Sequence, residues 1–300
     1  MALILLTGSS GQVGGELLKT LAPLGEIVAP GRAAMDLTDA ETIRQTIREL
    51  RPRWIVNPAA YTKVDKAESE PELAFAINQD AVRAIGEEAQ AIGAGVVHFS
   101  TDYVFDGAKE EPYVEDDATG PISVYGASKL AGEKALVASG AAYLIFRTSW
   151  VYGTTGTNFL RTILRLARER EVVRVVADQH GAPTWSWDLA NLAAYVIGRV
   201  EAKTVERGFS DTAAEWSGSY HAAGGGETTW HGFAVEAVRL ASQREPGTKF
   251  ARVEAISTAE YPTPARRPAN SRLNCDKLAE RFGWRMMEWH DSLREVMAEP

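Results

Sequence analysis

Tyr125 and Lys129 carry the side chains with the clearest chemical use, and they stand four residues apart in a segment expected to be helical to about Ala138. Side chains at that spacing share one face of a helix. A phenol has an ordinary pKa of about 10, and lowering it by about three units takes about 4 kcal/mol of preferential stabilisation of the phenolate. A fixed cation supplies part of that stabilisation. The pair fits a proton donor, although long amphipathic helices also produce such pairs by chance.

A glycine-punctuated turn near the N-terminus predicts a dinucleotide site. It follows an apolar run at 2–6 and precedes helical periodicity at 16–24. Its GxxGxxG spacing would allow a tight turn, close approach of a pyrophosphate to backbone N–H groups, and close helix packing. An ordinary glycine turn is the alternative, and the strand-turn-helix context favours the cofactor. The residues expected to contact it are Gly8, Ser10, Gly11, Gln12, Val13 and Gly14.

Arg32 stands where the adenosine end of the cofactor is expected, just after a short strand at 26–29. NAD-selective folds usually place an acidic residue there to hold the ribose 2′-hydroxyl. An arginine suits a 2′-phosphate instead, which favours NADPH and keeps NADH as an option, with Asp36 and Leu37 flanking the adenine. The other interpretation makes Arg32 a solvated loop residue.

Small and polar residues follow two further predicted strands. Ala59 and Ala60, with Tyr61 after them, come directly after the strand at 54–57 and would border the cofactor, or serve only as packing residues. Thr101 closes the strand at 95–99. Because ligands of doubly wound sheets gather at the carboxyl ends of the strands, its hydroxyl could bind a substrate carbonyl. A strand cap is the alternative.

Strands and helices alternate regularly through the first two thirds of the chain, which predicts an α/β fold with a Rossmann-type, doubly wound parallel sheet covered on both faces. The further strands are expected at 143–147 and 172–176, and helices at 40–50, 73–92 and 158–170. Residues 205–219 resemble a surface loop. After it come a strand at 220–222, a helix at 230–242, a strand at 251–256, and helices at 276–282 and 288–297.

These elements predict two domains. We expect a NADPH-binding Rossmann domain in residues 1–150 plus about 171–205, and a smaller α/β substrate-binding domain in about 151–170 plus 217–300. The net charge of −8 argues against a nucleic-acid partner. The start of the chain lacks a signal peptide, no stretch is long enough to span a membrane, and there is one cysteine. We expect a soluble cytoplasmic protein.

Several blocks in the same order give a resemblance over nearly the whole length. They are residues 7–14, 64–68, 100–105, 125–129, 146–152, 178–184, 263–268 and 270–271. With these blocks the chain closely resembles the dTDP-4-dehydrorhamnose reductase family, within the extended short-chain dehydrogenase/reductase superfamily. One block would be weak evidence, whereas all of them in order are strong evidence.

The resemblance implies residue roles. It gives a catalytic triad of Thr101, Tyr125 and Lys129, sugar contacts from Asp102, Tyr103 and Trp150, and nucleotide-diphosphate contacts around Arg267 and Asn270. An arginine fork suits a diphosphate, and an indole suits a sugar or base face. The implied reaction is NADPH-dependent reduction of the C4 keto group of dTDP-4-dehydro-L-rhamnose to dTDP-L-rhamnose. Tyr125 would be the proton donor, and Lys129 would also hold the nicotinamide ribose.

A departure from the family concerns metal. Members are described as dimers bridged by a divalent metal on glutamates, and only Glu16 stays acidic at the matching positions here. Trp187 and His290 replace the others, with Asp188 next to the first. We therefore expect no Mg²⁺ site, with Glu16 and Asp188 as the remaining candidates, and a monomer or weak homodimer.

Three rival functions stay open. A nucleotide-sugar dehydratase typically needs an Asp-Glu pair where this chain has Asp102 and Tyr103, which counts against it. An epimerase of the same superfamily would recycle its cofactor and so consume no NADPH. A non-catalytic NADP-binding subunit, like the β subunit of methionine adenosyltransferase, would act through a protein partner instead of a nucleotide-sugar substrate.

Overall fold

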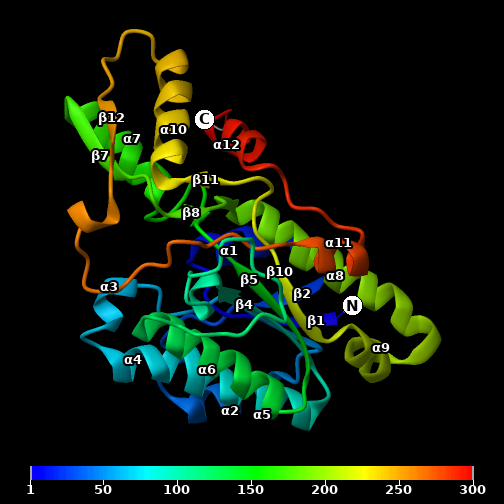
Figure 1. The fold of residues 1–300 in the computed structure, drawn as a ribbon. Coiled ribbons are helices and arrows are strands. Elements are labelled where there is room, and N and C mark those ends of the chain that lie inside the picture. Colours follow the sequence, from blue (N-terminus) through cyan, green and yellow to red (C-terminus); the bar gives the residue numbers. More distant parts are fainter. Residues whose placement is uncertain (1, 299–300) are drawn as a thin grey trace.

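A six-stranded, all-parallel sheet forms the centre of the computed structural model, which describes residues 2–298, without the side chains of residues 205–207 (Figure 1). In spatial order β10-β5-β4-β3-β1-β2 its strands are β10 (Gly218–His221), β5 (Ala142–Thr148), β4 (Gly95–Thr101), β3 (Trp54–Asn57), β1 (Ala2–Leu6) and β2 (Gly25–Val28). The order reverses direction at the β1–β3 pair, where doubly wound folds open a ligand crevice. The predicted α/β fold is confirmed.

Helices cover both faces of this sheet (Figure 1). One face carries α2 (Ala40–Leu50), α5 (Ala81–Ile92) and α6 (Val124–Ala138); the other carries α1 (Gln12–Thr20), α8 (Ser186–Arg207), α9 (Phe209–Trp216) and α11 (Asp276–Phe282). Because apolar side chains leave both faces of each central strand, two cores form. Ile43, Ile85 and Leu136 belong to the first, and Leu17 and Val196 to the second.

A second group of elements stands above the strand ends, at the upper left of Figure 1. It contains α7 (Phe159–Glu169), β7 (Val172–Val176), α10 (Trp230–Arg244), β12 (Arg252–Ile256) and α12 (Trp289–Ala298). Two short pairs join it to the sheet: β6 (Val151–Tyr152) with β9 (Thr184–Trp185), and β8 (His180–Gly181) with β11 (Thr228–Thr229). Phe233, Leu160 and Trp289 form its core.

The strand at 172–176 exists, but its predicted place in the central sheet is wrong. It pairs in parallel with β12 in a separate two-stranded sheet, and β10 is the sixth central strand. The burial of β7 alternates along its length, whereas β3 and β4 are buried at every position. A strand with one solvated face does not suit a sheet covered on both sides. The division into two domains stays a prediction.

The loop predicted at 205–219 is also wrong, because most of it is helical. Gly208, with a φ of 81°, separates the end of α8 from α9. Thr212, Ala213 and Trp216 of α9 are buried. The Phe209 and Trp54 rings pack edge to face, with their centroids 5.2 Å apart. The Gly, Ser and Thr content of the segment hid this apolar face. The 22-residue helix α8 was not predicted at all.

Other boundaries differ in smaller ways. The predicted helix at 16–24 is α1, which begins earlier, at Gln12. The predicted helix at 73–92 is three consecutive helical pieces: α4 (Pro71–Phe75), a π-helical turn η1 (Ala76–Asp80), and α5. The remaining short elements are α3 (Val64–Ala67) and the 3₁₀ turns η2 (Asp102–Val104) and η3 (Thr258–Glu260). Within residues 2–298, no helix combines the length and apolarity needed to cross a bilayer.

Candidate active site

The turn between β1 and α1 requires its glycines. Gly8 has a φ of 58°, in the left-handed region, and a Cβ there would lie 2.9 Å from Ala59. A Cβ on Gly14 would lie only 2.0 Å from the carbonyl oxygen of Gly8. Helix α1 then starts after Gly11, whose N-cap position supplies no side-chain hydrogen bond. Its first N–H groups are therefore available to a ligand.

Two cavities flank this turn and share part of their lining, so they form one groove along the strand ends. A cavity of about 290 Å³ is lined by residues including Ser10, Arg32, Asp36, Leu37, Ala59 and Ala60. One of about 350 Å³ is lined by residues including Gly8, Ser10, Gly11, Gln12, Val13, Gly14, Ala59, Ala60, Ser100, Tyr125, Lys129 and Thr148. The groove brings together the predicted cofactor residues apart from Tyr61.

Tyr61 lies beside the groove without lining either cavity. Its hydroxyl donates to Glu70 at 2.6 Å, and this hydrogen bond raises the pKa of Tyr61 to about 12. Its backbone N–H donates to Asn78 at 2.8 Å. Tyr61 thus fixes the segment after β3.

Arg32 and Asp36 lie at the far end of the groove. The Arg32 Nε donates to Asp36 at 3.3 Å, and 80% of the Arg32 side chain is exposed. The Asp36 carboxylate also accepts from the backbone N–H and hydroxyl of Thr38, which lower its pKa. The guanidinium can therefore turn toward a ligand without leaving a buried charge unpaired.

Tyr125 and Lys129 lie where α6 begins, capped by the hydroxyl of Ser123, which accepts from the Gly126 N–H. The two side chains are 9% and 2% exposed and line the same cavity. Burial raises the pKa of Tyr125, and the nearby Asp102 raises it further. Burial lowers the pKa of Lys129 to about 8. The Lys129 Nζ donates to the Phe99 carbonyl at 2.7 Å.

Helix α6 approaches its neighbours so closely that glycine is needed at two contacts. A Cβ on Gly126 would lie 2.2 Å from the Tyr103 carbonyl oxygen, and one on Gly132 would lie 2.0 Å from that of Asn78. Asn78, in the π-helical turn, donates to the Tyr61 carbonyl and to the Ser128 hydroxyl at 2.9 Å. Such turns often occur at functional sites, and this one fixes α6 against the groove.

Thr101 ends β4 beside Tyr125. Its hydroxyl donates to Asp102 at 2.9 Å and accepts from the Tyr103 N–H at 3.2 Å, so it also caps η2. Burial raises the pKa of Asp102 to about 6, and one of its carboxylate oxygens has no hydrogen-bond partner among the described residues. The Tyr103 ring meets the Tyr125 ring edge-on at 5.5 Å. These residues place polar groups around the phenol.

A third cavity, of about 440 Å³, extends from η2 to the upper group of elements, and Asp65, Tyr103, Trp230 and Arg267 contribute to its lining. Arg267 pairs with Asp65 at 2.7 Å and donates to the Tyr103 hydroxyl at 3.1 Å. Tyr103, predicted to contact the sugar, and Arg267, predicted to contact the diphosphate, thus line the same cavity. A cavity lined by arginines and aromatic rings has the chemistry to bind a nucleotide diphosphate.

Three predicted substrate residues, Asp102, Trp150 and Asn270, do not line this cavity. Trp150 stacks on Trp230 at 3.8 Å and has a φ of 50°, a conformation that bulky residues rarely adopt. Asn270 donates its amide to the carbonyls of Lys109 and Glu111 and accepts from Arg272. Asn270 therefore anchors the surrounding loops.

The candidate metal ligands have other partners. Glu16 forms an ion pair with Lys19 at 3.0 Å, and the buried Asp188 carboxylate accepts from the Met287 N–H at 2.8 Å. Trp187 stacks on Trp185, and His290 lies against Trp289. Among the residues with described side chains, no three His, Cys, Asp or Glu residues gather as a metal site.

Sequence reasoning missed His98, Asn57, Asn78 and Ser128, which surround Lys129 and α6. All four are buried. Their only signal was polarity within apolar segments: His98 interrupts the run Val96–Phe99, and Asn57 ends a strand of large apolar residues. That signal points to a buried hydrogen-bond network, because buried polar groups need partners.

Comparisons with known proteins agree with one another. A family model described as the RmlD substrate binding domain matches residues 1–300. The dTDP-4-dehydrorhamnose reductase of Escherichia coli strain K12 is 46% identical over 302 residues, covering 99% of this chain and 97% of the relative. That of Sinorhizobium fredii is 47% identical over 292 residues, covering 97% and 95%.

Solved structures give the same result. The dTDP-4-dehydrorhamnose reductase of Bacillus anthracis, in complex with NADP, is 35% identical with a TM-score of 0.88, covering 100% of this chain and 99% of the other. The UDP-glucose 4-epimerase of Thermus thermophilus, in complex with NAD, has a TM-score of 0.75 over 98% and 97% of the two chains at 21% identity. The latter likeness concerns the fold alone.

Proposed function

The chain belongs to the dTDP-4-dehydrorhamnose reductase family, and from its site we propose that it binds NADPH and reduces the C4 keto group of dTDP-4-dehydro-L-rhamnose to give dTDP-L-rhamnose. The observation that carries the proposal is the shared cavity of the glycine turn, Tyr125 and Lys129. A proton donor, a cation and a pyrophosphate-binding turn thus face one space.

The groove fits the cofactor in two respects. Its backbone passes so close to Ala59 that only glycine suits position 8, and the N-terminus of α1, which has no side-chain cap, lies in the lining of the cavity. Ser100 and Thr148 line the same cavity, and their buried hydroxyl oxygens have no hydrogen-bond partner among the described residues. Buried hydroxyls without a partner are costly, and a polar ligand would satisfy them.

Each end of the cofactor has assigned residues. We assign the pyrophosphate to the turn at residues 8–14 and the adenosine 2′-phosphate to Arg32, with Asp36 and Leu37 beside the adenine. We assign the nicotinamide ribose to Lys129. NADPH, when bound, supplies the hydride. The Bacillus anthracis relative, solved with NADP, supports the choice of cofactor.

Tyr125 donates its phenolic proton to the oxygen of the reduced carbonyl. The lowered pKa expected from the neighbouring cation is not found, because burial and then Asp102 raise the pKa of Tyr125; the phenol is therefore protonated at neutral pH, as an acid requires. The ammonium of Lys129 stabilises the phenolate left behind, and the Thr101 hydroxyl hydrogen-bonds the oxygen on which charge develops. Tyr103 and Arg267 lie in the adjoining cavity, where we place the nucleotide diphosphate.

Replacing the phenolic hydroxyl tests the assignment. Tyr125→Phe is expected to lower turnover by about 10²- to 10⁴-fold and to leave NADPH affinity nearly unchanged, since the ring still fills its place. The assay follows nicotinamide absorbance with dTDP-4-dehydro-L-rhamnose. Tyr113→Phe is the matched control, because the Tyr113 hydroxyl bonds Asp106 outside the groove. Wild-type turnover in Tyr125→Phe refutes the assignment.

The same assay separates the rival functions. A reductase consumes NADPH in proportion to product, whereas an epimerase shows no net consumption. A regulatory subunit would bind NADPH without turnover. Against a dehydratase, the residue after Asp102 is Tyr103, whose hydroxyl accepts from Arg267 and supplies no carboxylate.

A further inference from the structure

A chain of four buried polar side chains links Lys129 to the glycine turn. The Lys129 Nζ lies 3.3 Å from the His98 Nε2, and the His98 Nδ1 lies 3.1 Å from the Asn57 side-chain amide. The other end of that amide accepts from the Thr7 hydroxyl at 2.5 Å. All four side chains are at most 3% exposed. Buried polar networks of this kind fix the groups at their ends.

The backbone explains why the four meet. Asn57 and His98 are direct partners in the parallel register of β3 and β4, and Thr7 follows β1, with its N–H bonded to the Val56 carbonyl. The network therefore crosses the β1–β3 pair, where the strand order reverses. It runs beneath the groove from the start of the glycine turn to the ammonium beside Tyr125.

Among the described residues, Lys129 forms no ion pair with a carboxylate, which is the usual partner of a buried cation. Within the described part of the chain, its Nζ bonds two atoms, the Phe99 carbonyl oxygen and the His98 Nε2. The charge of Glu133, one helical turn along α6, raises the pKa of Lys129 against the larger effect of burial, but its carboxylate bonds the Arg147 guanidinium at 2.8 Å and not the lysine. Asp102 and Tyr103 face Tyr125 instead. Two neutral acceptors thus hold the ammonium.

The neutral His98 imidazole can form a hydrogen bond with Lys129 whether the lysine is an ammonium or a neutral amine. An ammonium has donors only, so beside it Nε2 must accept and the ring proton must sit on Nδ1, facing the Asn57 oxygen. In the structure the Asn57 Nδ2 faces the His98 Nδ1 and its Oδ1 accepts from Thr7, so the ammonium state requires the amide to turn over, with its nitrogen then donating to the Thr7 hydroxyl. Beside a neutral amine the ring proton moves to Nε2 and the amide turns its nitrogen to Nδ1. Burial, and then the charge of Lys129, lower the pKa of His98 well below its usual range, so the ring stays neutral.

We propose that His98 is a positioning residue that holds Lys129 as an ammonium beside Tyr125 and the cofactor groove, with Asn57 and Thr7 fixing the orientation of the imidazole. The role rests on the proposed function, because it concerns the lysine that we assign to the nicotinamide ribose and the phenol. His98 does not touch the cofactor or the substrate; it acts through Lys129.

NADPH affinity measured against pH tests this role without turnover. The quenching of tryptophan fluorescence by bound NADPH gives the affinity between about pH 6 and pH 10, and the midpoint of its alkaline loss reports the charge of Lys129. His98→Leu removes the acceptor and is expected to move this midpoint down by about one pH unit. His98→Gln keeps an acceptor at the reach of Nε2 and should restore most of the shift.

Two further variants guard against a purely structural effect. His221→Leu removes another imidazole that is 0% exposed, whose Nδ1 faces the Tyr113 carbonyl and not Lys129. It should lower stability without moving the midpoint. If His98→Leu does not fold, His98→Asn takes its place, because the shorter amide reaches only the Nδ1 position and should still shift the midpoint.

The outcomes are distinct. A downward shift in His98→Leu or His98→Asn, reversed in His98→Gln and absent in His221→Leu, supports the proposal. An unchanged midpoint, or the same shift in the Gln and Asn variants, overturns it. At saturating NADPH, the alkaline midpoint of kcat should likewise be lower in His98→Leu and His98→Asn than in His98→Gln and His221→Leu. If the wild-type protein reduces no ketosugar, the proposed function fails, while the binding profile still decides the role of His98.

Discussion

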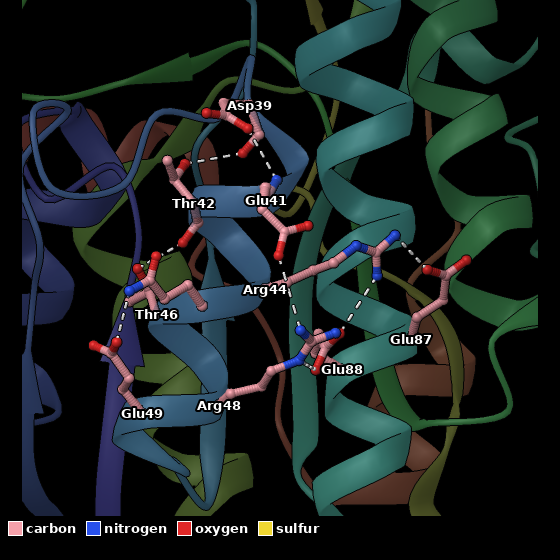
Figure 2. Close-up of polar contacts among 10 residues, drawn as sticks. Asp39, Glu41, Thr42, Arg44, Thr46, Arg48, Glu49, Glu87 and Glu88 are labelled. Atoms are coloured by element: carbon pink, nitrogen blue, oxygen red, sulfur yellow. Dashed lines mark hydrogen bonds and ion pairs between the residues drawn. The ribbon is translucent and has the colours of Figure 1, made fainter.

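Glu88 and Lys129 are almost equally buried, at 5% and 2% exposed, yet their surroundings treat charge in opposite ways. Figure 2 shows Glu88 on α5 facing two arginines of α2. It accepts from Arg48 at 2.9 and 2.5 Å and lies 3.5 Å from Arg44. The Arg48 hydrogen bond lowers the pKa of Glu88 in spite of burial. Lys129 has only neutral acceptors, and burial lowers its pKa to about 8.

We interpret Glu88 as a charge that stabilises the fold and Lys129 as a charge that serves the proposed reaction. Around Glu88 the native state favours the ionised form, and the helices α2 and α5 are held together by it. Around Lys129 the native state disfavours the ionised form, although the proposed chemistry needs it. Sites whose groups are held against their preferred ionisation are typical of catalytic centres.

The largest effect is expected from Lys129→Met. Turnover should fall at least about 100-fold, because the phenolate loses its cation. Stability at neutral pH should rise by up to roughly 3 kcal/mol, since a lysine whose pKa is lowered from 10.5 to about 8 pays for burial of its charge. Urea unfolding and the nicotinamide assay measure the two effects. Lys134→Met, exposed on the same helix, is the control and should change neither. A marked loss of stability in Lys129→Met contradicts the comparison.

The reverse pattern is expected at Glu88. Glu88→Gln should destabilise the fold by about 2 kcal/mol, a value held down because Arg48 is half exposed and can turn to solvent. NADPH affinity and turnover should stay at wild-type values, as Glu88 lines neither cavity of the groove. Glu87→Gln is the control: that carboxylate is 44% exposed and pairs with Arg44 at 2.7 Å, so its loss should have a smaller effect. If Glu88→Gln and Glu87→Gln lower the free energy of unfolding equally, Glu88 contributes no more to stability than the exposed Glu87.

The pH dependence of stability sharpens the comparison further. The folded-state pKa of Lys129 lies below its unfolded value of 10.5, so between about pH 8 and 10.5 the unfolded chain binds more protons. Stability should therefore rise with pH in this window, by about 2 to 3 kcal/mol in wild type relative to Lys129→Met. Glu88 acts at acid pH. Its pKa in the folded state is lower than in the unfolded state, so the stability it contributes is complete above the unfolded-state pKa and is lost as the pH falls through the folded-state pKa. Urea midpoints for both proteins at two alkaline pH values give the measurement.

Much of the groove could be predicted because it depends on local rules. Strand ends of a parallel sheet converge, so Thr101 and the residues after β1 and β3 had to lie together, and the four-residue spacing placed Lys129 beside Tyr125. The glycine pattern located the turn. These inferences need no knowledge of which strands pair at the sheet edges.

The remainder depends on contacts between distant segments. Nothing in residues 172–176 indicates that they pair with 252–256, and the apolar face of α9 appears only once α8 covers the sheet. His98 acts through Asn57 and Lys129, 41 and 31 residues away in the chain. Trp150 and Asn270 were assigned to the substrate through family resemblance, and their packing against Trp230 and the loop carbonyls could not be read from type or spacing.

The smallest effect is expected at a third charged site, the Arg32–Asp36 ion pair, whose arginine side chain is 80% exposed. Arg32→Ala should weaken NADPH binding about tenfold and leave NADH binding unchanged, because only the 2′-phosphate distinguishes the two cofactors. Stability should not change, since the Arg32–Asp36 pair is exposed to solvent. Arg83→Ala, which breaks a similar exposed pair with Asp80, is the control and should affect neither cofactor. Fluorescence titration with both cofactors gives the ratio of affinities. If that ratio is the same in wild type and Arg32→Ala, Arg32 is a solvated loop residue, and the selectivity for NADPH must come from another part of the groove.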